Sequence, residues 1–319
     1  MNYAVTTPNG TLSLFLALKA VGVGVGDEVI IPGLSFIATA SAVMLAEAKP
    51  VFADVATYDC NILPDEIEKL ISSKTKVIMP VHINGRNADL EAIMKIANKH
   101  GIPVVEDAAQ ALGSIYNGKS LGTIANAGSI SLAPTKIITS AQGGLVLTNE
   151  KEICETIIKL KDHGRLMRKW NFHPEIGFNF KFNDIHAALA VVQLKRLSER
   201  LEKAKLDYIQ YCDGLEEISE IEFFQTNFSA GNVPLWVDIK FKKNRKNFIE
   251  FMQNRDITCR PFWPPINCQK PYIKYSKKRL KNSEQIASNG LWLPSGPSKT
   301  KSDIIRVITE TKNYFNNKY

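Results

Sequence analysis

Short apolar runs alternate with amphipathic segments through the first half of the chain. The apolar runs are rich in Val and Ile and cover 26–32, 49–55, 75–83 and 102–109. The segments between them carry apolar positions at helical spacing and cover 10–22, 35–48, 63–73 and 88–101. This alternation predicts an α/β fold with a mostly parallel sheet and helices on both faces.

The second half of the chain predicts a change of architecture. Two more strands, a helix and an irregular loop are expected at 127–134, 143–149, 151–162 and 163–180. From 183 to 215 the helical period is unbroken, which predicts one helix of more than 25 residues that leads from one domain to the next. Strands at 232–241 and 257–264 and helices near 246–256 and 300–316 follow. We therefore expect a large domain of residues 1–214, including the long helix, and a small C-terminal α+β domain of residues 215–319.

The composition is that of an ordinary globular protein and narrows the choice of partners. The 319 residues are 45% hydrophobic, and the formal net charge of +8 would suit an anionic small molecule. No stripe of basic and aromatic residues argues for nucleic acid as a partner. The five cysteines have no metal-like spacing, and no apolar run reaches the roughly 20 residues that span a bilayer. We expect a cytoplasmic protein with no metal and no membrane partner.

Two phosphate-binding motifs occur without the context that they need. GSIYNGKS at 113–120 matches the Walker A pattern, but no helical period follows it, and Asn117-Gly118 is a hairpin turn signal. GVGVGD at 22–27 follows a helix instead of opening one, which indicates a helix end and a turn. We reject the P-loop nucleoside triphosphatase and dinucleotide-binding interpretations.

Several chemically capable residues fall near the expected strand ends. Lys136 lies in the apolar stretch SLAPTKIITSAQGG, where a buried amine needs a partner or a task. Asp107 ends a strand at the edge where open α/β sheets bind ligands, although an aspartate there is also a common helix N-cap. Gly10 and Thr11 open a helix, whose first N–H groups are free to bind an anion.

Phe36 and His82 complete this set, each with an ordinary structural alternative. Phe36 could belong to the core, and a histidine at a strand end is more often a hydrogen-bonded structural residue than a catalyst. Together, an anion site, an aromatic plane, a carboxylate and an enclosed lysine match the requirements of pyridoxal 5′-phosphate.

The ordered motifs resemble those of the DegT/DnrJ/EryC1/StrS family of sugar aminotransferases, which are fold type I pyridoxal phosphate enzymes. The motifs extend over almost the whole chain and are GDEVIIPGLSFIATASAV, AKPVFADV, VHINGR, VVEDAAQALGS, SLAPTK, GG, DHG and GFNFKFNDIHAALAVVQLKRL. The resemblance implies a large sheet domain with a smaller C-terminal domain. It also implies that Lys136 forms the Schiff base and that Asp107 pairs with the pyridine nitrogen.

The resemblance extends to the other cofactor contacts. Gln110 would lie beside the ring and Phe36 would stack on it. The phosphate would be held by Gly10, Thr11 and Ser131. In the family an asparagine of the neighbouring subunit also reaches the phosphate, and Asn179 occupies that position, which implies a homodimer with shared active sites.

The family chemistry implies the reaction. Asp107 would keep the ring nitrogen protonated, and Lys136, once released, would move a proton as a free amine of lowered pKa. We expect L-glutamate as the amino donor and a nucleotide-diphosphate keto sugar as the acceptor. CRPFWPP and WNFHPEIGFNFK look most like the branch that aminates C4, such as the perosamine synthases. His163, Arg260 and Trp263 are candidate substrate contacts, with surface or packing roles as the alternative.

The sequence also departs from the family pattern. Leu132 replaces a usual aromatic residue, Ala141 and Gln142 replace a glycine and a glutamate, and Lys181 replaces an arginine. Family members carry a further N-terminal segment, whereas this chain begins almost at its first strand. The alternative function is therefore a catalytically idle or truncated paralogue that binds a nucleotide sugar or a partner. Lys136 argues against the dehydratase branch of the family, in which histidine replaces this lysine.

Overall fold

The computed structural model describes residues 1–166 and 171–316. Residues 167–170 of the expected loop and residues 317–319 of the expected small domain lie outside the described residues.

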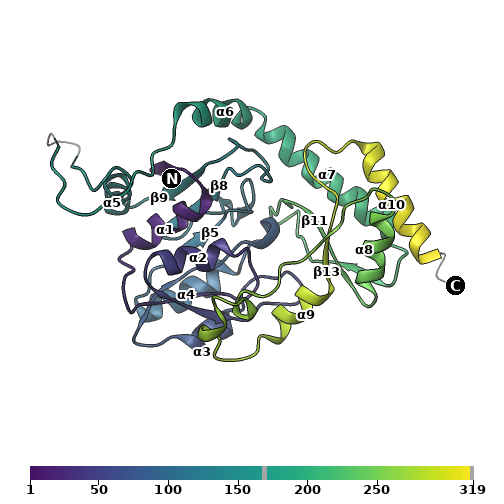
Figure 1. Cartoon of the computed structure of the whole chain (residues 1–319), viewed down its shortest axis with the longest axis horizontal. Helices are drawn as coiled ribbons and strands as arrows, with labels where there is room; N and C mark the ends of the chain where they lie inside the picture. Colours follow the sequence, from purple (N-terminus) through teal and green to yellow (C-terminus); the bar gives the residue numbers. More distant parts are fainter. Residues whose placement is uncertain (167–170, 317–319) are drawn as a thin grey trace.

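A mostly parallel sheet of seven strands, here called the large sheet, forms one side of the molecule (Figure 1). Its order is β3-β2-β4-β5-β8-β9-β1, because two parallel bridges, from Ile78 to Val104 and from Val81 to Asp107, join the groups β3-β2-β4 and β5-β8-β9-β1. Only β9 runs against the other six. The strands are β1 (Tyr3–Thr7), β2 (Glu28–Pro32), β3 (Lys49–Ala53), β4 (Thr75–Ile78), β5 (Val105–Asp107), β8 (Ala127–Ser131) and β9 (Gly144–Thr148). The α/β fold expected from the sequence is confirmed.

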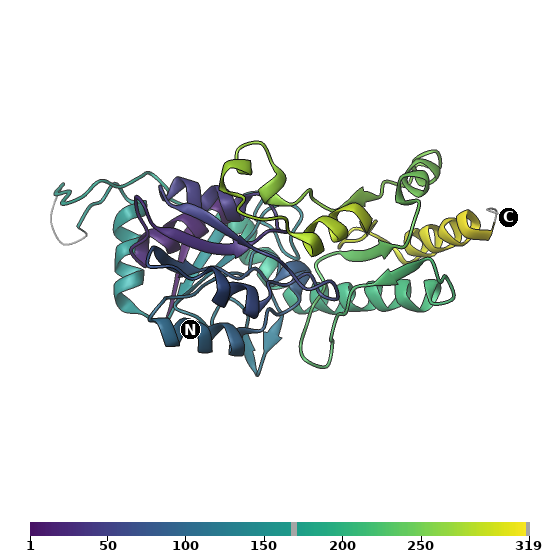
Figure 2. The ribbon, with the colours of Figure 1, turned by 90° about the horizontal axis from the view of Figure 1, so that it is seen from below.

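Helices cover both faces of the large sheet (Figure 2). Ile31 of β2 belongs to the same apolar cluster as residues of α1 (Gly10–Ala20), α2 (Ala38–Leu45) and α5 (Lys151–Lys161). Ile30 belongs to a cluster with residues of α3 (Pro64–Leu70) and α4 (Leu90–His100). Because consecutive residues of a strand point to opposite faces, these two isoleucines mark the two helical layers.

A second, antiparallel sheet, here called the small sheet, lies toward the C-terminus (Figure 1). Its order is β10 (Ile221–Phe223), β11 (Val237–Phe241), β13 (Gly290–Leu293) and β12 (Arg260–Pro261). Its core contains Ile239 of β11 together with Tyr211 of α7 (Leu197–Leu215), Phe248 of α8 (Arg245–Gln253) and Ile304 of α10 (Lys301–Asn316).

The segment between β12 and β13 returns to the large sheet. Ile266, Tyr272 and Leu280 are buried in the cluster that contains α1 and α2. Asp54, after β3, accepts a hydrogen bond of 2.9 Å from the N–H of Ser283 in α9 (Lys281–Asn289). Residues beyond 215 therefore contribute to the core of the large sheet, and the division of the chain into 1–214 and 215–319 stays a prediction.

The prediction of one unbroken helix over residues 183–215 is wrong. α6 (Asp184–Leu194) ends before a two-residue turn, and α7 begins after it in a different direction (Figure 1). Leu197 and Leu201 of α7 pack in one cluster with Ile137 of the loop after β8, and Ala190 of α6 also contacts this cluster, although no residue of α6 is fully buried. The spacing of apolar residues continues unchanged through the turn, so the sequence pattern did not reveal it. The direction of each helix is set here by tertiary packing.

Both rejected motifs adopt the structures expected for them. In the Walker-like segment, β6 (Ile115–Tyr116) and β7 (Lys119–Ser120) form a hairpin with Asn117 and Gly118 at its turn, and turns and bends lead from there to β8. In GVGVGD, Gly22 has a φ of 84° and the N–H of Val23 bonds to the carbonyl of Leu18, which ends α1. Within the described ranges, no helix is both long and apolar enough to cross a membrane, and no group of three His, Cys, Asp or Glu could hold a metal.

Candidate active site

The start of α1 and the end of β8 form a narrow, polar cradle. Asn9 caps α1, and its Oδ1 accepts a hydrogen bond of 2.9 Å from the N–H of Leu12. A Cβ atom on Gly10 would lie only 3.0 Å from the Cβ of Ser131, so a side chain at Gly10 would fill this space. The N–H groups of Gly10 and Thr11 have no acceptor within the helix, and they can bind an anion beside the hydroxyl of Ser131.

Asp107 is the last residue of β5 and is buried. Its Oδ2 accepts a hydrogen bond of 2.8 Å from the hydroxyl of Thr39 in α2, and its Oδ1 accepts one of 3.2 Å from the N–H of Ala109. Burial raises the pKa of Asp107, while these hydrogen bonds and the charges of Lys136 and His82 act to lower it. No helix begins after Asp107, so a role as helix N-cap does not explain it.

His82 has the structural role that was considered for it. Its Nδ1 accepts a hydrogen bond of 3.2 Å from the N–H of Ala88, so Nε2 carries the proton that points to Oε2 of Glu106 at 3.1 Å. The N–H of His82 also bonds to the carbonyl of Asp107 at 3.1 Å. His82 and Glu106 thus hold β5 in place, and Asp107, the next residue of the strand, points to the opposite face.

Lys136 lies on the loop between β8 and β9. Its backbone is next to the exposed Pro134 and Thr135, so the residue as a whole is half-buried, but its amine points inward. The Nζ atom lies 5.4 Å from the ring centroid of Trp236. Burial lowers the pKa of Lys136 to about 8, and the charge of Asp107 acts in the opposite direction. A substantial fraction of this amine is therefore neutral near physiological pH, unlike an ordinary lysine.

Gln110 is buried close behind Asp107, and its orientation is defined by one hydrogen bond. Its Oε1 accepts the N–H of Asn84 at 3.0 Å, which leaves the amide nitrogen available to a ligand. Asn84 lies in the short 3₁₀ segment Ile83–Gly85 after β4 and has a left-handed backbone, with φ 53° and ψ 32°.

An aromatic group, here defined as Phe36, Trp236, Trp263 and Trp292, lies between the two sheets. The ring of Trp263 is 5.9 Å from Phe36, 6.1 Å from Trp236 and 4.5 Å from Trp292. Phe36 is 51% exposed, so one side of its ring is free to contact a planar ligand. Arg260 is exposed on β12, and its backbone pairs with Trp292. Trp292 therefore lies next to both residues, since it pairs with Arg260 through its backbone and contacts Trp263 through its ring.

Asn179 and His163 lie on a hairpin outside this group. Asn179 pairs through its backbone with Asp162 and is exposed, whereas the flanking Phe178 and Phe180 stack at 4.8 Å and pack on α1. His163 is exposed and has a φ of 59°, in the left-handed region. No described contact brings either side chain to Lys136 of the same chain. This placement leaves Asn179 free to contact another subunit.

Three residues of the site were missed in the sequence. Thr39 was not singled out within the helix SFIATASAV, although it lies near one turn of helix from Phe36. Asn84 lies in the motif VHINGR but was not singled out within it, and Trp236 lies in none of the motifs; the roles of both depend on contacts between segments about 150 residues apart. A periodicity argument considers neighbours in sequence and cannot find such pairs.

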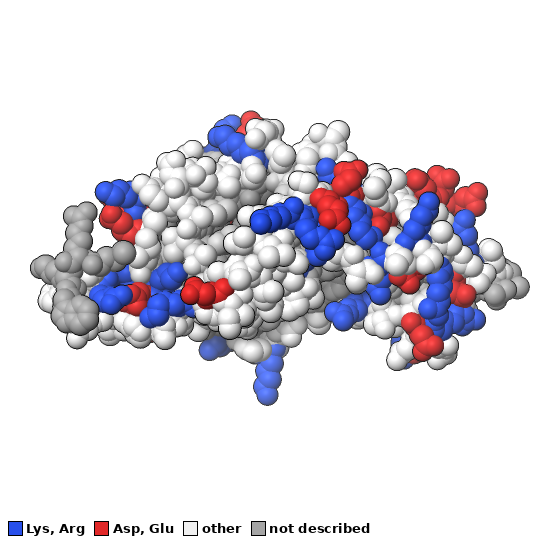
Figure 3. Space-filling view, turned by 90° about the horizontal axis from the view of Figure 1, so that it is seen from above, with Lys and Arg blue, Asp and Glu red and all other residues white. Residues whose placement is uncertain are grey.

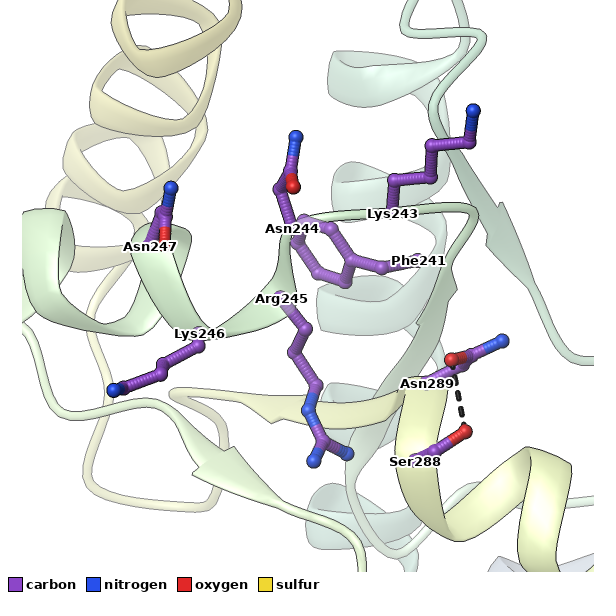
Figure 4. Close-up of a pocket in the computed structure, with 8 residues that line it drawn as sticks. All are labelled: Phe241, Lys243, Asn244, Arg245, Lys246, Asn247, Ser288 and Asn289. Carbon is purple, nitrogen blue, oxygen red and sulfur yellow. Dashed lines mark hydrogen bonds between the residues drawn. The ribbon is translucent and has the colours of Figure 1, made fainter.

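A surface hollow of about 290 Å³ lies elsewhere, at the start of α8 (Figure 4). Lys243, Arg245 and Lys246 line it, and the guanidinium of Arg245 donates to the carbonyls of Ala287 and Gly290. The hollow shares no residue with the cradle, the aromatic group or the loop of Lys136. It is part of the small sheet's surface and not of the candidate active site.

The fold and this set of residues define a pyridoxal phosphate-dependent aminotransferase of fold type I. An anion cradle at a helix N-terminus, a buried carboxylate, an aromatic ring and a lysine amine of lowered pKa are what this cofactor requires. The chain belongs to the DegT/DnrJ/EryC1/StrS aminotransferase family, whose sequence profile matches residues 1–312.

Characterised relatives and solved structures agree with this assignment. The chain is 31% identical to the GDP-perosamine synthase of Vibrio cholerae over 99% of its own length and 87% of that protein. It is 32% identical to the GDP-perosamine synthase of Caulobacter vibrioides over 97% of its own length and 84% of that protein. An aminotransferase from Psychrobacter cryohalolentis superposes with a TM-score of 0.92 at 28% identity, covering 99% of this chain and 87% of that one. NtdA of Bacillus subtilis, solved with bound PMP, superposes with a TM-score of 0.92 at 28% identity, and the match covers 99% of this chain and 74% of NtdA.

Proposed function

We propose that the protein transfers the amino group of L-glutamate to a keto group of a nucleotide-diphosphate deoxy sugar, at C4 of the sugar. The observation that carries the aminotransferase part is the anion cradle between Gly10 and Ser131 at the end of β8, with the buried carboxylate of Asp107 at the end of the paired strand β5 and the inward-pointing amine of Lys136 on the loop after β8. The sugar and its carbon rest on the similarity to the two GDP-perosamine synthases.

The residues of the site fit pyridoxal 5′-phosphate. Gly10, Thr11 and Ser131 would hold the phosphate, since the cradle has room there only because residue 10 lacks a side chain. Phe36 would stack on the ring, and Gln110 would lie at its side. When bound, the cofactor supplies an electron sink that makes the α-proton of the donor amino acid removable.

Asp107 and Lys136 would divide the proton chemistry between them. Asp107 would hold a proton on the ring nitrogen, and the positive charge there would offset the cost of burying its carboxylate. Lys136 would attach the cofactor and, when free, take up and deliver protons at the donor carbon. Its lowered pKa suits a group that must be a neutral amine in order to act as a base.

The site would be completed by a second copy of the chain. α6 has no buried residue although it is mostly apolar, and Ile185, Val191, Val192 and Leu194 are each more than half exposed. On the face viewed in Figure 3, the surface over α6 is largely without charged side chains. An apolar surface of this kind is typical of an oligomer interface. We propose a homodimer in which Asn179 reaches the phosphate of the neighbouring subunit, while His163, Arg260 and Trp263 contact the sugar nucleotide.

The test is the visible absorption spectrum of the protein after incubation with pyridoxal 5′-phosphate and removal of the free cofactor. We expect a visible band in the wild-type protein that is lost when L-glutamate is added, and no such band in Lys136→Ala. Lys119→Ala, which removes the lysine of the Walker-like hairpin, is the matched control and should behave as wild type. A wild-type protein without the band would support the idle paralogue instead. Incubation with 4-keto and 3-keto nucleotide sugars would then identify the aminated carbon.

A further inference from the structure

Trp236 places an aromatic ring beside the Lys136 amine from a distant part of the chain. It precedes β11, in the small sheet, whereas Lys136 lies between two strands of the large sheet. The ring is 5.4 Å from Nζ and packs in the same apolar cluster as Leu132 and Ile137, which belong to the loop of Lys136. The contact therefore connects the small sheet directly to the lysine.

The side chain of Asn84 bonds to both backbone groups of Trp236. The Asn84 Nδ2 donates to the carbonyl of Trp236 at 2.9 Å, and the Asn84 Oδ1 accepts the N–H of Trp236 at 2.7 Å. The backbone N–H of Asn84 bonds at the same time to Oε1 of Gln110 at 3.0 Å. Asn84 is 1% exposed, so these hydrogen bonds have little competition from water. One residue thus sets the position of two side chains of the site.

We propose that Trp236 is an active-site residue that contacts the amine of Lys136, and that Asn84 is the positioning residue for both Trp236 and Gln110. The assignment rests on the proposed function for its catalytic meaning, but the contact itself belongs to the protein without cofactor. Trp236 closes one side of the lysine to water and offers a π face to its ammonium form.

These two effects act on the pKa of Lys136 in opposite directions. Exclusion of water lowers it, and a cation–π contact raises it; burial is the larger of the causes that act on this amine. The charged group that acts on Lys136 is Asp107, whereas the side chain of His82 bonds to Glu106 on the opposite face of β5. On the side of α7, the guanidinium of Arg200 donates to the carbonyl of Ile137, the next residue along. Removal of the ring should therefore raise the pKa of Lys136.

The contact between Asn84 and Trp236 is not needed to join the two sheets. Arg86 and Asp238 form a bidentate ion pair of 2.9 and 2.8 Å nearby, and both side chains are buried. Ser114 accepts the N–H of Val233 at 2.9 Å. A variant that loses only the Asn84 side chain should therefore remain folded, with the sheets still joined.

The experiment measures the pKa of Lys136 in the cofactor-free protein. The rate of acetylation by acetic anhydride is followed against pH, and the Lys136 peptide is quantified by mass spectrometry. The variants are Trp236→Ala, Trp236→Phe, Asn84→Gly and the double variant of Asn84→Gly with Trp236→Ala. Glycine is chosen because residue 84 has a positive φ, and because it keeps the backbone N–H that bonds to Gln110.

We expect Trp236→Ala to raise the pKa of Lys136 by about one unit, a tenfold smaller fraction of neutral amine at pH 7. Trp236→Phe should restore most of the wild-type value. Asn84→Gly should shift the pKa in the same direction but less, and should add nothing in the Trp236→Ala background. Asn87→Ala is the matched control, since Asn87 bonds to Asn232 in the same contact region without touching Trp236 or Gln110. It should leave the pKa unchanged.

Two results would overturn the proposal. The first is an unchanged pKa of Lys136 in folded Trp236→Ala. The second is a pKa shift caused by Asn84→Gly that is equally large when Trp236 has already been replaced by alanine. Circular dichroism establishes that each variant is folded, and Trp236→Phe provides the conservative case. Because the protein is measured without cofactor, the outcome does not depend on whether it transaminates. In the cofactor-loaded enzyme, Asn84→Gly should lower kcat more than it changes KM for L-glutamate.

Discussion

At the scale of single residues, the role proposed for Asp107 comes with a cost in stability. Its carboxylate is buried with two hydrogen bonds, and burial raises its pKa. A carboxyl group whose pKa is raised by folding contributes stability below its unfolded pKa, and loses that contribution as the pH rises through the folded value. At neutral pH the charged form is therefore a destabilising element until a positive ligand arrives.

We predict that Asp107→Asn stabilises the cofactor-free protein at pH 7 by about 1 kcal/mol while reducing activity by on the order of 100-fold or more. Asparagine keeps an acceptor for Thr39 and loses only the longer bond of 3.2 Å from the N–H of Ala109, while it has no charge to bury and none to hold a ring proton. Thermal unfolding of the cofactor-free proteins measures the stabilisation, and the difference in stability between Asp107→Asn and wild type should shrink as the pH is lowered. A variant less stable than wild type at pH 7 would contradict this account.

At the scale of elements, Glu106 fixes the end of β5 to the loop that precedes β8. Besides His82, its carboxylate accepts the N–H groups of Gly122, Ile124 and Ala125, each at 2.7 Å. Burial acts to raise the pKa of Glu106, but His82 and these N–H groups outweigh it, so the pKa is lowered. A buried carboxylate with four donors stabilises the local backbone only while it stays ionised.

Glu106→Gln should lower the free energy of unfolding by about 3 kcal/mol, because an amide nitrogen cannot accept the hydrogen bonds that one carboxylate oxygen accepts. The folded pKa of Glu106 is lowered, so its contribution is present above the unfolded pKa and is lost as the pH falls through the folded value. The difference in the free energy of unfolding between Glu106→Gln and wild type, measured with urea, should thus become smaller at acidic pH. Glu152→Gln, an exposed carboxylate on α5, is the control and should change little. Equal stability of Glu106→Gln and wild type at pH 7 would be the contrary result.

At the scale of the whole molecule, the proposed second subunit would account both for the exposed apolar residues of α6 and for the exposed Asn179. Apart from Ala190, which packs against the cluster of Ile137, α6 leaves its larger apolar side chains exposed. Asn179 is exposed between two phenylalanines that stack on each other and pack on α1. A second subunit over α6 would remove apolar surface from water and could bring Asn179 to a neighbouring site.

Mixing two inactive variants tests this arrangement. If each site takes Lys136 from one subunit and Asn179 from the other, Lys136→Ala and Asn179→Asp mixed in equal amounts should recover about a quarter of the wild-type activity, because half of the dimers would carry one intact site. Refolding the variants together and assaying transamination measures this. Val192→Asp, at the exposed face of α6, should give a monomer in light scattering. Absence of recovery in a sample that is dimeric would exclude shared sites.

The local elements of this protein could be predicted from its sequence, because they depend on nearby residues. Strand ends, the start of α1, the hairpin in the Walker-like segment and the turn at Gly22 all follow from spacing and from turn residues. The placement of Asp107 and Ser131 at the same edge of the large sheet follows too, since they end the paired parallel strands β5 and β8. Likewise, the isolated amine of Lys136 in an apolar stretch marked it as a candidate for a chemical role.

Only the tertiary structure decided how distant segments meet around that edge. The turn between α6 and α7, the return of residues 266–280 to the core of the large sheet, and the hydrogen bonds from Asn84 to Trp236 join parts of the chain that are far apart in sequence. Periodicity records which face of an element is apolar, but not which element will cover that face. The sequence by itself thus determined the cradle, the carboxylate and the lysine, whereas packing decided what encloses the lysine amine and so lowers its pKa.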